Sequence, residues 1–194
     1  ATASTGKTIA LGATPLLGTG FLTTLIDRIQ TETPFSSIRL VEGYSQQINA
    51  MLRSGTLDIA IGYELSEGPH AERLGELHQD MRLAASGNWD LPEGPVSFAM
   101  LDTLPIVTFD PPSQVKSLLT SHAAEQGITL SFCHSIDSLP LILALVGAGG
   151  GVTVLPASAL CGPPAQGLTV RTIGPEPLTM TMQVAASLRA GVSS

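Results

Sequence analysis

The chain has 194 residues, of which 43% are hydrophobic and only 13% charged, so it can form a large core and is not expected to be disordered. Its net charge of −7 argues against direct contact with the phosphate backbone of nucleic acid. Two cysteines, Cys133 and Cys161, are too few for a disulfide framework and show no metal-ligand spacing. Neither has a basic neighbour that would favour a thiolate, so a redox pair is not predicted. With no secretory signal at the N-terminus, a reduced, cytoplasmic setting is expected.

The N-terminal residues contain a loose phosphate-binding pattern. Ala1 and the run Gly6, Lys7 and Thr8 satisfy its spacing. A true phosphate-binding loop follows a strand and opens a helix, whereas this one precedes a predicted strand. These N-terminal residues are therefore interpreted as a linker.

The first third of the chain alternates between predicted strands and helices. Strands are expected at residues 8–13, 38–41 and 57–62. Apolar residues at helical spacing predict one helix around residues 21–29, and Ser45 is a candidate N-cap for a second helix that Gly55 ends. Short connections of this kind favour a parallel sheet with right-handed crossovers.

The rest of the chain continues the alternation. A strand at residues 77–85 is followed by a loop at 87–95, which is rich in Gly, Pro, Asn and Asp. The remaining expected elements are strands at 104–109, 128–133, 168–173 and 178–186, and a helix at 115–126. The last strand is expected to return to the first part of the fold.

The stretch LPLILALVGAGGGVTVLP, residues 139–156, has no charged residue. It predicts a helix at 139–146, a glycine stop at 147–151 and a strand at 152–155 that Pro156 closes. A membrane span needs about 20 helical residues, and the glycines and proline break this helix first. A dinucleotide-binding motif runs strand, glycines, helix, which is the reverse order. The stretch is therefore interpreted as a helix–strand unit in the core of an α/β domain.

The end of this stretch, V-x-A-G-x-G-V-T-x-L-P, resembles the effector-binding domain of LysR-type transcriptional regulators. Three other motifs follow the same pattern in order: I-x-L-G-x-T from Ile9, L-x-E-G-x-S-x-Q from Leu40 and L-x-S-G-x-L-D-I-A-I from Leu52. The resemblance covers residues 8–188. It implies an α/β fold of the type 2 periplasmic-binding-protein class, with two Rossmann-like lobes joined by two crossover strands. Lobe I would comprise residues 1–84 and 175–194, and lobe II residues 85–174. The family's winged helix-turn-helix and its final helix have no counterpart in this sequence.

Catalytic chemistry finds little support in the sequence. No G-x-S-x-G elbow is present, and the carboxylates are scattered, mostly in polar loops. The four histidines lack the spacing of a metal site. No catalytic residue, metal or cofactor is therefore predicted, and a binding function is favoured over an enzyme.

Binding residues are expected where strands end. In open α/β sheets ligands lie past the carboxyl ends of the strands, and a cleft between lobes is the default pocket. Helices starting after Thr14 and Ser45 would aim positive dipole ends at a ligand, which favours a small anion or carboxylate. The candidate residues are Ala13, Thr14, Ser45, Gln46, Thr108, Phe109, Ser135 and Ile136.

Each candidate also has a purely structural interpretation. Ser45 would cap its helix, Thr14 would shape a turn, and Phe109 would pack in the core. The resemblance favours Thr14, Ser45 and Thr108, since LysR-type domains often place hydroxyls on the effector at these positions. Pro15 stands where some relatives have a polar residue, which reduces the number of donors there.

The resemblance also implies the partners. These are a small-molecule effector in the cleft between the lobes and a second copy of the chain, with tetramers in a full-length protein. DNA contact would come only through a domain outside this sequence, and no membrane is expected. The alternative is a stand-alone solute-binding protein of a transport system. A helix-turn-helix or a secretory leader in the parent gene would separate the two.

Overall fold

The computed structural model describes residues 8–34 and 36–189, so Ala1, Gly6 and Lys7 of the phosphate-binding pattern lie outside the described residues. The chain divides into two compact units. Unit 1 holds the described residues up to Gln79 and from Met180 onward, and unit 2 holds residues 80–179. The chain passes from one unit to the other inside two continuous strands, β4 and β10.

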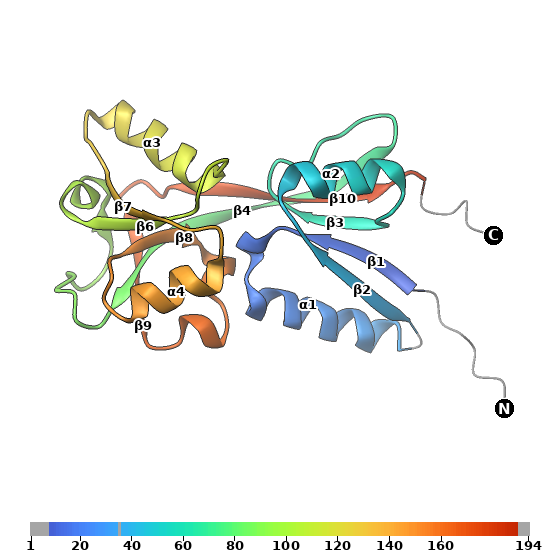
Figure 1. The fold of residues 1–194 in the computed structure, drawn as a ribbon, viewed down its shortest axis with the longest axis horizontal. Coiled ribbons are helices and arrows are strands. Elements are labelled where there is room, and N and C mark those ends of the chain that lie inside the picture. Colours follow the sequence, from blue (N-terminus) through green and yellow to red (C-terminus); the bar gives the residue numbers. More distant parts are fainter. Residues whose placement is uncertain (1–7, 35, 190–194) are drawn as a thin grey trace. The chain divides into compact units, whose positions relative to one another are not determined.

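Unit 1 is a sheet whose strands follow the order β2-β1-β3-β10-β4 (Figure 1). β1 runs parallel to β2 and β3, as predicted, and β10 is antiparallel to β3. The elements are β1 (Thr8–Ala13), η1 (Pro15–Leu17), α1 (Thr19–Glu32), β2 (Ser37–Glu42), α2 (Ser45–Ser54), β3 (Ile59–Gly62), β4 (Ala71–Ser86) and β10 (Thr179–Ser187).

The core of unit 1 forms where α2 packs on the sheet. The apolar face of α2 buries Ile48 and Leu52 against Leu57 and Ala60. Asp58 fixes the start of β3, since its carboxylate accepts a hydrogen bond from the Ala10 N–H at 2.7 Å. Apolar burial of this kind supplies most of the helix's stability. It also sets where the carboxyl ends of the strands and the N-terminus of α2 lie.

Unit 2 combines antiparallel and parallel strand pairs. β4 pairs antiparallel with β8 and β9, β5 is parallel to β9, and β6 is parallel to β7. A bridge between Ile106 and Val152 links β6 to β8. The remaining elements are β5 (Val96–Ser97), η2 (Phe98–Thr103), β6 (Pro105–Thr108), α3 (Gln114–Gln126), β7 (Ser131–Ser135), α4 (Leu139–Gly147), β8 (Thr153–Pro156), η3 (Ala157–Leu160), η4 (Pro163–Ala165) and β9 (Leu168–Gly174).

The predicted helix–glycine–strand unit is confirmed as α4 and β8. Ile142, Leu143 and Val146 of α4 are buried, and every residue of β8 is buried. Gly151 lies between them with φ +142°, and a Cβ there would come within 2.8 Å of the Pro105 carbonyl oxygen. Only glycine fits this backbone and this close approach. No helix in the described part of the chain is both long and apolar enough to cross a membrane.

Several element boundaries differ from the predictions. The strand predicted at 128–133 is β7, which starts at Ser131 because Ile128 still bonds back to Ala123 at the end of α3. The strand predicted at 57–62 begins at Ile59, since the Leu57 N–H bonds to Met51. β4 starts six residues before the predicted 77–85 segment, and β5, η2, η3 and η4 were not predicted.

Candidate functional site

Thr14 follows the last residue of β1, the fully buried Ala13. Its N–H donates to the carbonyl oxygen of Ile61 at 3.2 Å, and its side chain lies against Gly62. A Cβ on Gly62 would come within 2.5 Å of the Thr14 Cγ2 and 2.8 Å of its Oγ1, so the glycine makes room for the threonine. Thr14 is 3% exposed, and its hydroxyl has no hydrogen-bond partner among the described residues.

The helix predicted around residues 21–29 is confirmed as α1, but its N-terminus does not adjoin Thr14. A short 3-10 turn, η1, comes first, and α1 begins at Thr19 after Gly18. The cause is Pro15, which holds the preceding residue extended: Thr14 has φ −85° and ψ 146°. The dipole of α1 therefore cannot be assigned to Thr14.

The prediction of Ser45 as an N-cap is wrong. Tyr44 occupies the cap position, and Ser45 is the first residue of α2. The Ser45 hydroxyl donates to the carbonyl oxygen of Tyr63 at 2.7 Å, which ties α2 to the end of β3. Gln46 is exposed beside it. No side chain caps α2, so no side-chain acceptor offsets the positive end of its dipole.

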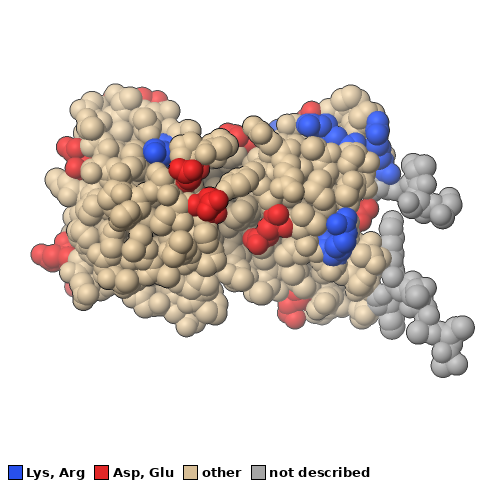
Figure 2. Space-filling model, viewed as in Figure 1, with Lys and Arg blue, Asp and Glu red and all other residues tan. Residues whose placement is uncertain are grey.

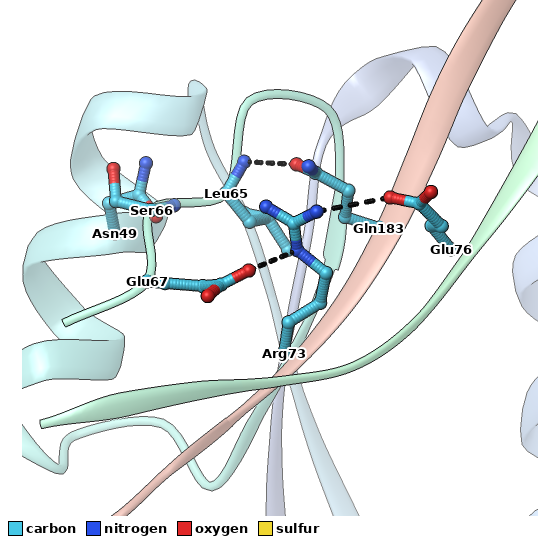
Figure 3. Close-up of polar contacts among 7 residues, drawn as sticks. All are labelled: Asn49, Leu65, Ser66, Glu67, Arg73, Glu76 and Gln183. Atoms are coloured by element: carbon cyan, nitrogen blue, oxygen red, sulfur yellow. Dashed lines mark hydrogen bonds and ion pairs between the residues drawn. The ribbon is translucent and has the colours of Figure 1, made fainter.

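Two side chains that the sequence analysis missed hold the loop after β3 (Figure 3). Asn49 donates to the Glu64 carbonyl oxygen at 2.9 Å and accepts from the Ser66 N–H at 2.8 Å. Gln183 of β10 accepts from the Leu65 N–H at 2.7 Å. These bonds hold Glu64 at φ +53°, a conformation that is costly for a residue with a side chain. The loop is thus fixed on both sides, together with the Tyr63 carbonyl that Ser45 binds.

Figure 3 also shows Arg73 bound to two carboxylates of the same unit. Its guanidinium lies 2.7 Å from Glu67 and 3.0 Å from Glu76, and all three side chains are at least a third exposed. Exposed ion pairs contribute little to stability. Arg73 and its two carboxylate partners are therefore surface residues and are not assigned to the site.

In unit 2 the strand ends bring Thr108 and Ser135 together. They are the last residues of β6 and β7 and are direct partners in the strand register. The Ile136 N–H donates to the Thr108 carbonyl oxygen at 2.9 Å, which keeps the two ends aligned. Phe109 is 6% exposed, in keeping with a packing role. Thr108 is 1% exposed, and its hydroxyl has no partner among the described residues.

Lys116, in the first turn of α3, lies beside these residues and was not predicted. Its Nζ is 3.5 Å from the Ser135 Oγ and 5.0 Å from the ring centroid of Phe132. Within residues 8–34 and 36–189, no carboxylate lies within 4.0 Å of this ammonium group. Only its place in the fold, over β7, identifies it, because sequence spacing does not relate residue 116 to residue 135.

The described residues contain no cluster of three or more potential metal ligands. Cys133 and Cys161 are both exposed, and each thiol contacts a backbone carbonyl. Basic side chains gather over the α2 end of unit 1 in Figure 2, and the visible face of unit 2 carries little basic surface. Unit 2 has three basic residues against eight acidic ones.

Comparison with known proteins confirms the resemblance. The LysR substrate binding domain family matches residues 2–191. The nitrogen assimilation regulatory protein nac of Klebsiella aerogenes is 25% identical over 189 residues, which are 95% of this chain and 61% of that protein. The chain therefore spans about three-fifths of the length of this relative.

Solved structures show the same fold. The C-terminal domain of a probable LysR family regulator from Rhodococcus sp. RHA1 is 26% identical, with a TM-score of 0.77, over 97% of this chain and 94% of that one. The effector-binding domain of QuiR in complex with shikimate has a TM-score of 0.75 at 17% identity, over 95% of this chain and 88% of that one.

Proposed function

Because the chain belongs to the LysR substrate-binding domain family, we propose that it is the effector-sensing domain of a transcriptional regulator. It binds a small metabolite, with an anion or carboxylate favoured, and catalyses no reaction. The residues proposed to contact the effector are Ala13, Thr14, Ser45 and Gln46 in unit 1, and Thr108, Phe109, Ser135 and Ile136 in unit 2.

The observation that carries this proposal is the pair of unpartnered hydroxyls on Thr14 and Thr108. Both residues are almost fully buried. Thr14 directly follows β1, and Thr108 is the last residue of β6, so each stands where the first strand of a β-α unit ends. A buried hydroxyl without a partner costs about 1–3 kcal/mol, and a bound ligand that hydrogen-bonds to it removes that cost. The N-terminus of α2, which has no side-chain cap, adds a positive dipole end that suits a carboxylate.

The regulatory step follows from the family. An effector that binds one conformation of the domain more tightly shifts the population toward it. In a longer regulator that shift would reach a DNA-binding domain outside this sequence and control transcription. We propose a cytoplasmic protein that acts as a homodimer, or as a tetramer in its full-length form. Among the structural neighbours is CbnR, solved in complex with its target DNA.

The test is thermal unfolding of the domain against a panel of small carboxylates, inorganic anions and aromatic acids. A ligand that binds only the folded state stabilises it by about 2.7 kcal/mol at a hundredfold excess over its Kd. We expect at least one compound to raise the Tm of the wild type, and expect Thr14→Val or Thr108→Val to weaken that shift.

Thr153→Val is the matched control. Thr153 is also fully buried with an unpartnered hydroxyl, but it lies at the start of β8 and not at a carboxyl end. The same chemical change there should leave the ligand-induced shift intact. A panel without any active compound, or an active compound whose shift survives both Thr14→Val and Thr108→Val, would contradict the proposal.

A further inference from the structure

We infer that Lys116 is the group that recognises the charge of the effector, and that it selects singly charged carboxylates over neutral isosteres and over dianions. This inference rests on the proposed function and adds a specificity-determining residue to it. Three features of unit 2 support it: the convergence of Lys116 with two hydroxyls, its position in α3, and the acidic residues around it.

The first feature is that Lys116, Ser135 and Thr108 lie on one face of the β6–β7 pair. Thr108 and Ser135 are register partners, so their side chains point to the same side of the strands. The Lys116 ammonium lies over the ring of Phe132, whose register partner is Ile106, two residues before Thr108. A register shift lies between the Ile106–Phe132 and Thr108–Ser135 pairs, so simple alternation does not hold across it. The contacts place the three polar groups instead: Lys116 reaches Ser135, and Ser135 is the register partner of Thr108.

The contacts of Lys116 leave it able to bind an anion. An ammonium group has three donors, and the one hydrogen bond observed, to the Ser135 hydroxyl, is long at 3.5 Å. The contact with Phe132 at 5.0 Å orients the side chain without using a donor. The unpartnered hydroxyl of Thr108 gives an independent sign of a missing ligand.

The second feature is the place of Lys116 in the helix. Its N–H is capped by the Ser113 hydroxyl, which puts the lysine in the first turn of α3. Positive side chains are unfavourable at the positive end of a helix dipole. The first turn of α3 holds no acidic residue that would offset this cost. A side chain that departs from the local charge preference of its helix in this way is typical of functional positions.

The third feature sets the charge of the ligand. Asp110 and Asp137 follow β6 and β7, and the Asp110 N–H bonds to the Ile136 carbonyl oxygen, so both exposed carboxylates belong to the same pair of loops. Lys116 is the cation that these loops have beside them, and the two carboxylates oppose further negative charge. We therefore expect a ligand with a second negative charge to bind less tightly than a singly charged one.

The experiment compares wild type and Lys116→Gln by thermal shift. The probes are acetate, benzoate and shikimate, each beside its amide, with succinate and inorganic phosphate as dianionic comparators. The wild type should prefer one monocarboxylate over its amide. In Lys116→Gln we expect the affinity for that carboxylate to fall about tenfold, the scale of a lost charge-assisted hydrogen bond, with the amide unchanged.

Three further variants control for charge and folding. Arg28→Gln removes an exposed, weakly paired cation of α1 in unit 1 and should leave the preference unchanged. Asp137→Asn should strengthen carboxylate binding, and Lys116→Arg should restore part of it. A carboxylate preference that persists in Lys116→Gln would overturn this inference and leave the proposed function standing. A wild type that responds to no probe would instead refute the proposed function, and the inference with it.

Discussion

Gly62 is the position at which the geometry around Thr14 can be tested most directly. A Cβ on Gly62 would lie 2.5 Å from the Thr14 Cγ2, and both belong to a buried part of unit 1. Overpacking of this kind costs about 1–3 kcal/mol. Without this clash, Gly62→Ala would stabilise the protein by about 0.4–1 kcal/mol, because alanine reduces the conformational entropy of the unfolded chain and the φ of Gly62 is not positive. We therefore expect Gly62→Ala to destabilise unit 1 by about 1–2 kcal/mol.

Thr14→Ala should rescue most of this loss. It removes the two closest atoms and leaves the Thr14 Cβ, which lies 3.2 Å from the added methyl group. Gly62→Ala should therefore be nearly neutral in the Thr14→Ala background, a coupling of about 1–2 kcal/mol in a double-mutant cycle. Gly75→Ala is the control, because a Cβ there meets no atom within 4 Å.

The chain offers a separate optical probe for each unit. Both tyrosines, Tyr44 and Tyr63, belong to unit 1, and the one tryptophan, Trp89, belongs to unit 2. Urea unfolding followed by both signals should show the Gly62→Ala loss in the tyrosine signal, at an unchanged m-value. Strictly additive free energies for the two substitutions, or a Gly62→Ala variant as stable as Gly75→Ala, would refute the packing argument.

Three more substitutions test particular contacts by the same unfolding assay. Asn49→Ala should cost about 2–4 kcal/mol, because it leaves two peptide groups of the loop after β3 without their partners; a loss below 1 kcal/mol would show that the loop does not depend on them. Thr153→Val should stabilise unit 2 by about 1 kcal/mol, since it removes a buried hydroxyl without a partner, and a destabilised variant would reveal an acceptor for it. Gly151→Ala should cost about 2 kcal/mol or more through backbone strain and contact with the Pro105 carbonyl, and a neutral result would contradict the φ of +142°.

The sequence predicts the strands of this fold better than it predicts the surroundings of their ends. Periodicity and β-branched residues locate β1, β2 and β6 within a residue or two, since both signals are local. Ser45 fails as a predicted cap because its hydroxyl has a better-placed acceptor, the Tyr63 carbonyl, 18 residues away. That choice depends on tertiary structure.

The residues that the sequence analysis missed share this dependence. Gln183 bonds to Leu65 across 118 residues, and Lys116 of α3 reaches Ser135 of β7 across 19 residues. Neither residue belongs to a motif with a fixed spacing. Thr14 and Thr108 could be named as candidates because Thr14 directly follows a strand and Thr108 ends one, which is a property of the local sequence.

The strand order of unit 1 has a consequence for how the protein is made. β10 lies between β3 and β4 in the sheet, although about a hundred residues separate it from β4 along the chain. On the ribosome, the sheet of unit 1 therefore stays incomplete until the final strand emerges, whereas residues 80–179 of unit 2 are all available earlier. A nascent chain released before residue 180 would expose the facing edges of β3 and β4. Those edges, and not the core of unit 2, are where premature termination would lead to aggregation.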